Sequence, residues 1–86
     1  MAIWRINTCA LEGGYKSRGA IYSLIRDGLW TEPVKLGARA VGWPDSEVKT
    51  LVAARIAGYS EADIRELVRK LHQARIDGAP QMNGGA

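Results

Sequence analysis

Apolar residues recur with a helical period in the middle of this chain. The spacing i, i+3, i+4 of an amphipathic helix is given by Ile21, Leu24 and Ile25. Ser17 is a residue type that caps helices at the N-terminus, and Gly28 is one that ends them in a left-handed conformation. The pattern therefore predicts a helix over residues 18–27 with one buried face.

A shorter helix is predicted before it. It begins near Asn7 or Thr8, either of which can cap it, and ends at Glu12 because Gly13 follows. Cys9 lies on this helix and is expected to be a small core residue rather than a reactive thiol.

A third helix is predicted to follow Pro44, with Asp45 or Ser46 as its cap and Gly58 at its end. Its predicted apolar stripe consists of Val48, Leu51, Val52 and Ile56. This stripe should cover the core.

A fourth helix is predicted from about residue 60 to residue 75 or 76. Ser60 and Asp63 have the spacing of a capping box, and the helical repeat consists of Ile64, Leu67, Val68 and Leu71. We expect this apolar face to pack within the same domain, and a contact with a second copy is the alternative. His72 on this helix is expected at the surface.

Between the second and third helices the period changes from helical to alternating. Residues 34–36 and 39–43 are predicted to be two strands joined at Gly37 and Ala38. In that two-residue turn Val34 would face Val41, whereas a three-residue loop would change the pairing. Lys35 and Arg39 lie near the tip in either case.

Length and composition favour one small domain over residues 1–76, followed by a disordered tail over 77–86 that is rich in glycine and small residues. No apolar run approaches the roughly 18 residues of a membrane span, and the N-terminal residues lack the features of a secretory signal. Cys9 and His72 are each the only residue of their type, so we expect no metal, no cofactor and no enzymatic activity. The expected location is the cytoplasm, on the nucleoid when bound to DNA.

The positive charge is concentrated in the first half of the chain. Residues 1–44 carry six Lys or Arg against three Asp or Glu, and residues 45–86 carry six against six. A localised positive field attracts a polyanion. A helix can enter a major groove of DNA while a hairpin lies on the adjacent groove, so we expect double-stranded DNA as the partner. The predicted DNA-binding residues are Lys16, Ser17, Arg18, Gly19, Tyr22, Ser23, Arg26, Lys35 and Arg39.

A family resemblance adds to this interpretation. The runs S-R-G-A-I-Y-S-L-I-R-D-G-L-W over residues 17–30 and P-V-K-L-G-A-R-A-V-G-W over residues 33–43 resemble the AlpA family of phage and prophage regulators, as does S-E-V at residues 46–48. The resemblance implies a mainly α fold with a small β-hairpin: a winged helix-turn-helix of about four helices and a two-stranded wing, related to excisionases and MerR-like proteins. It also implies that residues 18–27 form the recognition helix and residues 33–43 the wing.

The sequence differs from the common family pattern at two places. Gly19, Ala20 and Ser23 stand where the family commonly has Ser, Thr and Arg, so two hydroxyl groups and one cation are missing from the reading helix. The turn before it carries Tyr15, which we expect to supply the core contact there.

The sequence thus favours a sequence-specific DNA-binding protein that regulates transcription of a phage or integrated element, as a homodimer or as copies in tandem on DNA. An excisionase acting on attachment-site DNA is the first alternative. The second is a protein-interaction adaptor that docks through the fourth helix.

Overall fold

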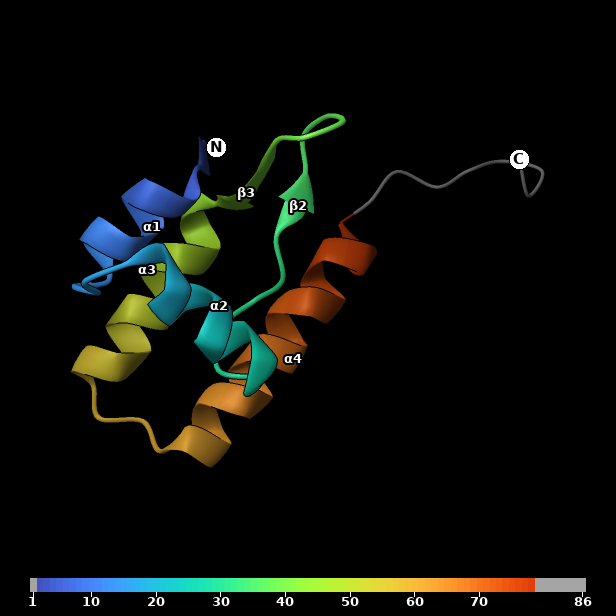
Figure 1. Ribbon diagram of the computed structural model, residues 1–86. Coiled ribbons are helices and arrows are strands. Elements are labelled where there is room, and N and C mark those ends of the chain that lie inside the picture. Colours follow the sequence, from blue (N-terminus) through green and yellow to red (C-terminus); the bar gives the residue numbers. More distant parts are fainter. Residues whose placement is uncertain (1, 79–86) are drawn as a thin grey trace.

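Four helices and a small antiparallel sheet make up the fold (Figure 1). The structure is a computed structural model, and it describes residues 2–78. The elements follow in the order β1 (Ile3–Trp4), α1 (Ile6–Glu12), α2 (Arg18–Arg26), β2 (Val34–Lys35), β3 (Val41–Pro44), α3 (Asp45–Ile56) and α4 (Glu61–Asp77). The predicted class, mainly α with a β-hairpin as in a winged helix, is confirmed.

The first two helices lie close to their predicted positions. Ser17 occupies the N-cap position of α2, and Gly28 follows its end with a positive φ of 78°. The prediction that Asn7 or Thr8 caps α1 was wrong, because the N-cap residue is Arg5 and the helix begins at Ile6. Strand β1 ends at Trp4, which leaves one residue between strand and helix.

The sheet has a strand that the sequence did not predict. Strand β1 pairs with β3, and β3 is the central strand in the order β1-β3-β2. Ile3 lies opposite Pro44, and Trp4 lies opposite Trp43. The wing therefore belongs to a three-stranded sheet rather than to an isolated hairpin. A strand of two residues is too short to display an alternating pattern.

The predicted two-residue hairpin turn was also wrong. Val34 pairs with Gly42 and Lys35 pairs with Val41, and the amide of Leu36 donates to the carbonyl of Ala40 at 2.8 Å. The loop therefore consists of three residues, 37–39.

In this register Gly42 lies in a crowded position. A Cβ there would be 2.6 Å from Cγ2 of Ile3 and 3.2 Å from Cδ1 of Leu36. Cross-strand neighbours share a face of a sheet, so two large side chains crowd this position and only glycine fits.

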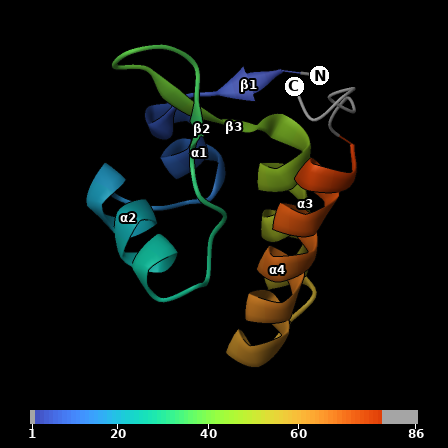
Figure 2. The same cartoon turned by 90° about the vertical axis from the view of Figure 1, so that its right-hand side faces the viewer.

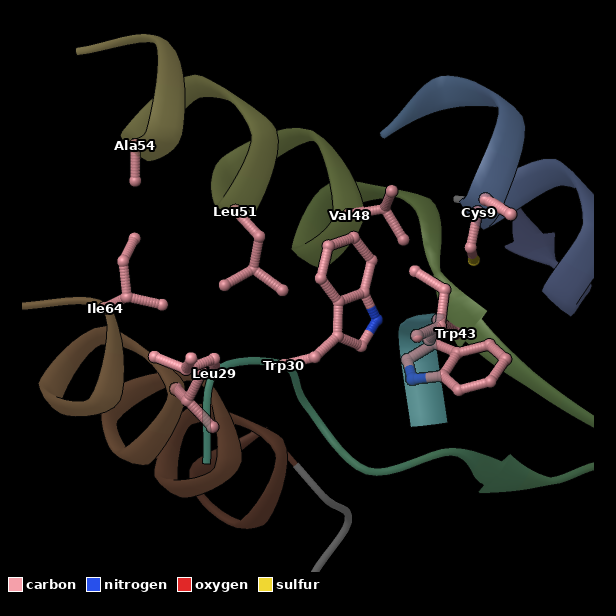
Figure 3. Close-up of a cluster of buried hydrophobic side chains, with 11 residues drawn as sticks. Cys9, Leu29, Trp30, Trp43, Val48, Leu51, Ala54 and Ile64 are labelled. Atoms are coloured by element: carbon pink, nitrogen blue, oxygen red, sulfur yellow. The ribbon is translucent and has the colours of Figure 1, made fainter. Parts of the chain in front are cut away.

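The core extends from the space between α3 and α4 to Trp43 of β3 (Figure 3). Its large, fully buried apolar side chains include Trp30, Trp43, Ile21, Leu51, Ile64 and Val48. The indole Nε1 of Trp43 donates to the carbonyl of Thr31 at 2.8 Å, which satisfies a buried donor. Cys9 is fully buried, as predicted. Tyr15 packs edge-on against Trp30 with ring centroids 6.0 Å apart, so it does supply the core contact of the turn.

The third helix departs from its predicted stripe at one residue. Val48 and Leu51 are buried, but Ile56 is 82% exposed and Ala54 is buried instead. Figure 3 shows Leu51 and Ala54 on the side of α3 that meets α4. Pro44 takes the N-cap position, with no side-chain hydrogen bond from a capping residue.

The fourth helix packs within the domain, as expected. Ile64 and Val68 are buried, and Leu67 and Leu71 pack against the core. The hydroxyl of Ser60 accepts from the amide of Asp63 at 3.2 Å, as the capping box predicts. The helix ends at Asp77, the first residue of the predicted tail, so that boundary was wrong by one residue. Residues 79–86 of the predicted tail lie outside the described residues.

Candidate nucleic-acid interface

Helix α2 presents a polar face to solvent because its apolar residues point into the core. Ile21 is fully buried, and Leu24 and Ile25 are partly buried against the core cluster. The exposed residues on and just before the helix are Lys16, Ser17, Arg18, Gly19, Tyr22, Ser23 and Arg26. Arg18, Gly19, Tyr22, Ser23 and Arg26 were predicted from helical spacing, and Lys16 and Ser17 from their place at the N-terminus of the helix.

Lys35 and Arg39 are the two remaining predicted residues. Lys35 ends β2, Arg39 is the third residue of the hairpin loop, and both are exposed. Figure 2 shows α2 and the tip of the β2–β3 connection projecting on the left, whereas α3 and α4 form the right side. The fold thus brings the predicted residues of α2 and of the wing to one side of the molecule.

Ion pairs divide the basic residues into two groups. The four ion pairs between described residues join Lys49 to Asp45, Arg65 to Glu61, Arg69 to Glu66 and Arg75 to Glu47. All eight of these residues lie on α3 or α4.

The basic residues of the predicted interface make no such pairs. Within residues 2–78, no carboxylate pairs with Lys16, Arg18, Arg26, Lys35 or Arg39. Their exposed cations therefore form no ion pair with a described carboxylate, and a group of such charges attracts a polyanion. A polyanion approaching these cations would replace small counterions rather than break ion pairs within the protein.

Arg5 is a further exposed cation, outside the predicted DNA-binding residues. It lies between β1 and α1, is exposed and forms no ion pair among the described residues. The count of charges over residues 1–44 included it, but no helical or strand pattern assigned it a face.

The thiol of Cys9 is poorly suited to nucleophilic chemistry. Burial raises the pKa of the Cys9 thiol to about 11, so the reactive thiolate is scarce near neutral pH. Residues 2–78 contain no cluster of three or more His, Cys, Asp or Glu suited to a metal ion. Over the same residues, no helix is long and apolar enough to cross a membrane.

Comparison with known proteins points to phage regulators. Residues 16–56 match the family model described as "Prophage CP4-57 regulatory protein (AlpA)". A curated relative, the uncharacterized protein ORF88 of Enterobacteria phage P4, is 50% identical over 42 residues, which cover 49% of this chain and 48% of that protein. The chain thus spans about half the length of this relative. No solved structure matches the chain. The resemblance inferred from the sequence is confirmed for the segment that contains α2, the wing and α3.

Proposed function

Since residues 16–56 of this chain belong to the AlpA family of regulatory proteins, we propose that the protein binds double-stranded DNA at specific sequences and regulates transcription of a phage or an integrated mobile element. In this proposal α2 enters the major groove and the wing, residues 33–43, lies on the adjacent groove.

One observation carries the proposal: five of the eight basic residues that form no ion pair within residues 2–78 lie on α2, on its approach and on the hairpin. Lys16, Arg18 and Arg26 come from one helix and its approach, and Lys35 and Arg39 come from the hairpin. A helix and a hairpin in one domain can contact neighbouring grooves of DNA. The cations of α3 and α4 would not serve equally well, because four of them are already paired with carboxylates.

The residues of α2 divide into two proposed roles. Arg18 lies in the first turn, where a guanidinium can donate two hydrogen bonds to O6 and N7 of guanine. Ser17, Lys16 and the first amides of α2 would bind a phosphate at the positive end of the helix. Tyr22 is 48% exposed, so its hydroxyl can reach a phosphate or its ring can contact a thymine methyl. Arg26 would bind the DNA backbone farther along the groove.

Gly19 and Ser23 would lower the surface between these side chains. A Cβ at Gly19 would meet only Oγ of Ser17, at 3.7 Å, so the fold does not require glycine there. A glycine inside a helix costs about 0.5–1 kcal/mol relative to alanine. Glycine at this position would let a base edge of DNA approach the helix closely, and this contact would offset the cost.

On the wing, Lys35 and Arg39 would bind phosphates or a narrow minor groove. These contacts hold the module on DNA and carry little sequence information themselves, so base selection rests with α2.

Excisionase activity requires the same DNA contacts, and the position of the target site separates it from transcriptional regulation. A site over a promoter supports the regulator, whereas repeated sites in an attachment region support the excisionase. Docking through α4 finds less support, because Ile64 and Val68 of its apolar face are buried within the domain.

The test is fluorescence anisotropy with labelled duplexes tiled across the DNA that flanks the gene, with excess random competitor and at two salt concentrations. We expect one tile to bind tightly and to lose affinity steeply with salt, by roughly 0.9 log units per phosphate contact for each tenfold increase. Equal, salt-insensitive affinities for all tiles would overturn the proposal.

Arg18→Ala and Arg55→Ala form a matched pair for the role of α2. Both arginines are exposed and neither is in an ion pair among residues 2–78, but Arg55 lies in the last turn of α3. Arg18→Ala should change which tile is preferred, and Arg55→Ala should not. Identical preferences in both variants would contradict the assignment of the recognition helix.

A further inference from the structure

Helix α4 holds the C-terminal end of α2 through a side-chain contact. Nε of Arg65 donates to the backbone carbonyl of Asp27 at 3.0 Å. The stem of Arg65 passes over Gly28, where a Cβ would lie 3.7 Å from Cγ of the arginine. A cation that bonds a carbonyl at the end of a helix also complements the negative end of the helix dipole.

The same helix holds the segment that follows. Nε2 of His72 accepts from the backbone amide of Glu32 at 3.0 Å. One terminal nitrogen of Arg75 donates to the carbonyl of Glu32 at 2.8 Å. Glu32 is two residues before β2, so its backbone is fixed by α4 on both its donor and its acceptor.

These bonds bear on DNA binding because residues 27–33 join the two elements that would touch DNA. Helix α2 packs mainly on α1, and β2 packs on β3. The segment between α2 and β2 contains no helix or strand of its own. Its hydrogen bonds to α4 therefore constrain how α2 is oriented relative to the wing.

Helix α4 lies wholly outside the segment that matches the family model. That segment ends at residue 56, the last residue of α3. The contacts to Asp27 and Glu32 run from this added helix back into the matched part of the chain.

We propose that α4 is a brace that fixes the orientation of the recognition helix relative to the wing, with Arg65 and His72 as its positioning residues. The proposal rests on the proposed function for its consequence, which is selectivity for one DNA sequence. A helix and a wing held at one angle can satisfy both grooves of a specific site together. If the angle varies, the phosphate contacts survive but base contacts weaken, because they depend on geometry.

The test uses the full chain and two matched controls on α4. Arg65→Ala is compared with Arg69→Ala, since each arginine pairs with a glutamate of the same helix but only Arg65 bonds the 27–33 segment. His72→Ala is compared with Gln73→Ala, because Gln73 bonds only Asp77 of its own helix. His72→Gln supplies an amide oxygen that can accept from the Glu32 amide in place of Nε2.

Selectivity is measured as the ratio of affinities for the preferred duplex and for a random duplex. We expect Arg65→Ala and His72→Ala each to lower this ratio about fivefold or more, with the affinity for the random duplex nearly unchanged. His72→Gln should recover much of the loss, and the two controls should keep the wild-type ratio. If selectivity were lost only because the variant is less stable, its recovery in His72→Gln would be accompanied by a change in the melting temperature.

A second measurement needs no DNA and separates failure of the brace from failure of the proposed function. Residual dipolar couplings report the orientation of α2 relative to the wing in the free protein, and amide exchange reports the Glu32 hydrogen bond. The brace predicts one fixed orientation in the wild type and averaging of that orientation in the Arg65→Ala/His72→Ala double variant. An unchanged orientation in the double variant overturns it, whether or not the wild type selects a DNA sequence.

Discussion

Arg75 of α4 and Glu47 of α3 form a bidentate ion pair in which Nε and one terminal nitrogen each lie 2.6 Å from a different carboxylate oxygen. Glu47 is only 6% exposed. The same guanidinium also donates to the carbonyl of Glu32. One side chain therefore neutralises a buried carboxylate at the start of α3 and holds the approach to the wing.

Arg75→Ala is expected to destabilise the fold strongly, because it leaves the Glu47 carboxylate buried without a partner. We expect a loss of about 3 kcal/mol in the free energy of unfolding, measured by urea denaturation. Arg69→Ala is the control, since its ion pair with Glu66 is exposed, and its unfolding should barely change. Equal effects of the two substitutions would show that Glu47 does not depend on Arg75.

Gly42→Ala tests the crowding at this position of the hairpin. The new Cβ would lie 2.6 Å from Cγ2 of Ile3 and 3.0 Å from the carbonyl of Trp4, so β1 would have to move from β3. We expect a loss of about 1–3 kcal/mol in stability. Gly37→Ala is the control, because nothing lies within 4 Å of its Cβ position. A neutral Gly42→Ala would contradict this crowding.

The second helix could be predicted because its signals are local. Ser17, the buried stripe and Gly28 all lie within one short segment, and α2 follows them closely. Exposure of the predicted DNA-binding residues within α2 follows from the same periodicity, which assigns each residue of the helix a face. Their contact with DNA remains a prediction.

The crowding at Gly42 could not be predicted because its main neighbour is not local. Gly42 is crowded by Ile3, which lies far away in the sequence and belongs to a strand of two residues. The bond from His72 to the amide of Glu32 has the same origin, since it joins residues 40 positions apart. No periodic pattern in the sequence indicates that Gly42 or His72 has a distant partner.

Alkaline pH should reduce stability through Cys9. Burial raises the pKa of its thiol from 9.0 to about 11, so the unfolded chain loses this proton at lower pH than the folded chain does. The free energy of unfolding should therefore fall as the pH rises from 9 to 11, by about 2 kcal/mol in total, and then level off. The measurement is urea denaturation of the wild type and of Cys9→Ala at each pH. Parallel pH curves for the two proteins would contradict the assigned cause.

The wing cations should control the salt dependence of DNA binding. Lys35→Ala is expected to weaken all duplexes alike and to reduce the slope of log affinity against log salt by about 0.9. Lys70→Ala is the matched control, since Lys70 is an exposed lysine of α4 with no ion pair among residues 2–78. If Lys70→Ala changed the slope as much, the wing would hold no special place in the interface.

Gly19→Ala should separate folding from recognition, because the two respond in opposite directions. A Cβ at this position meets no obstacle in the free protein, and alanine favours the helix, so stability should rise by about 0.5–1 kcal/mol. The same methyl group would stand on the face that approaches the base edges, so the affinity for the preferred duplex should fall. Thermal unfolding and anisotropy on one preparation measure both effects.

Thr50→Ala provides the comparison, as an exposed position of α3 where alanine also favours the helix. Its DNA affinity should stay at the wild-type value. If Gly19→Ala gained stability and kept full affinity, α2 would not approach DNA closely at this residue.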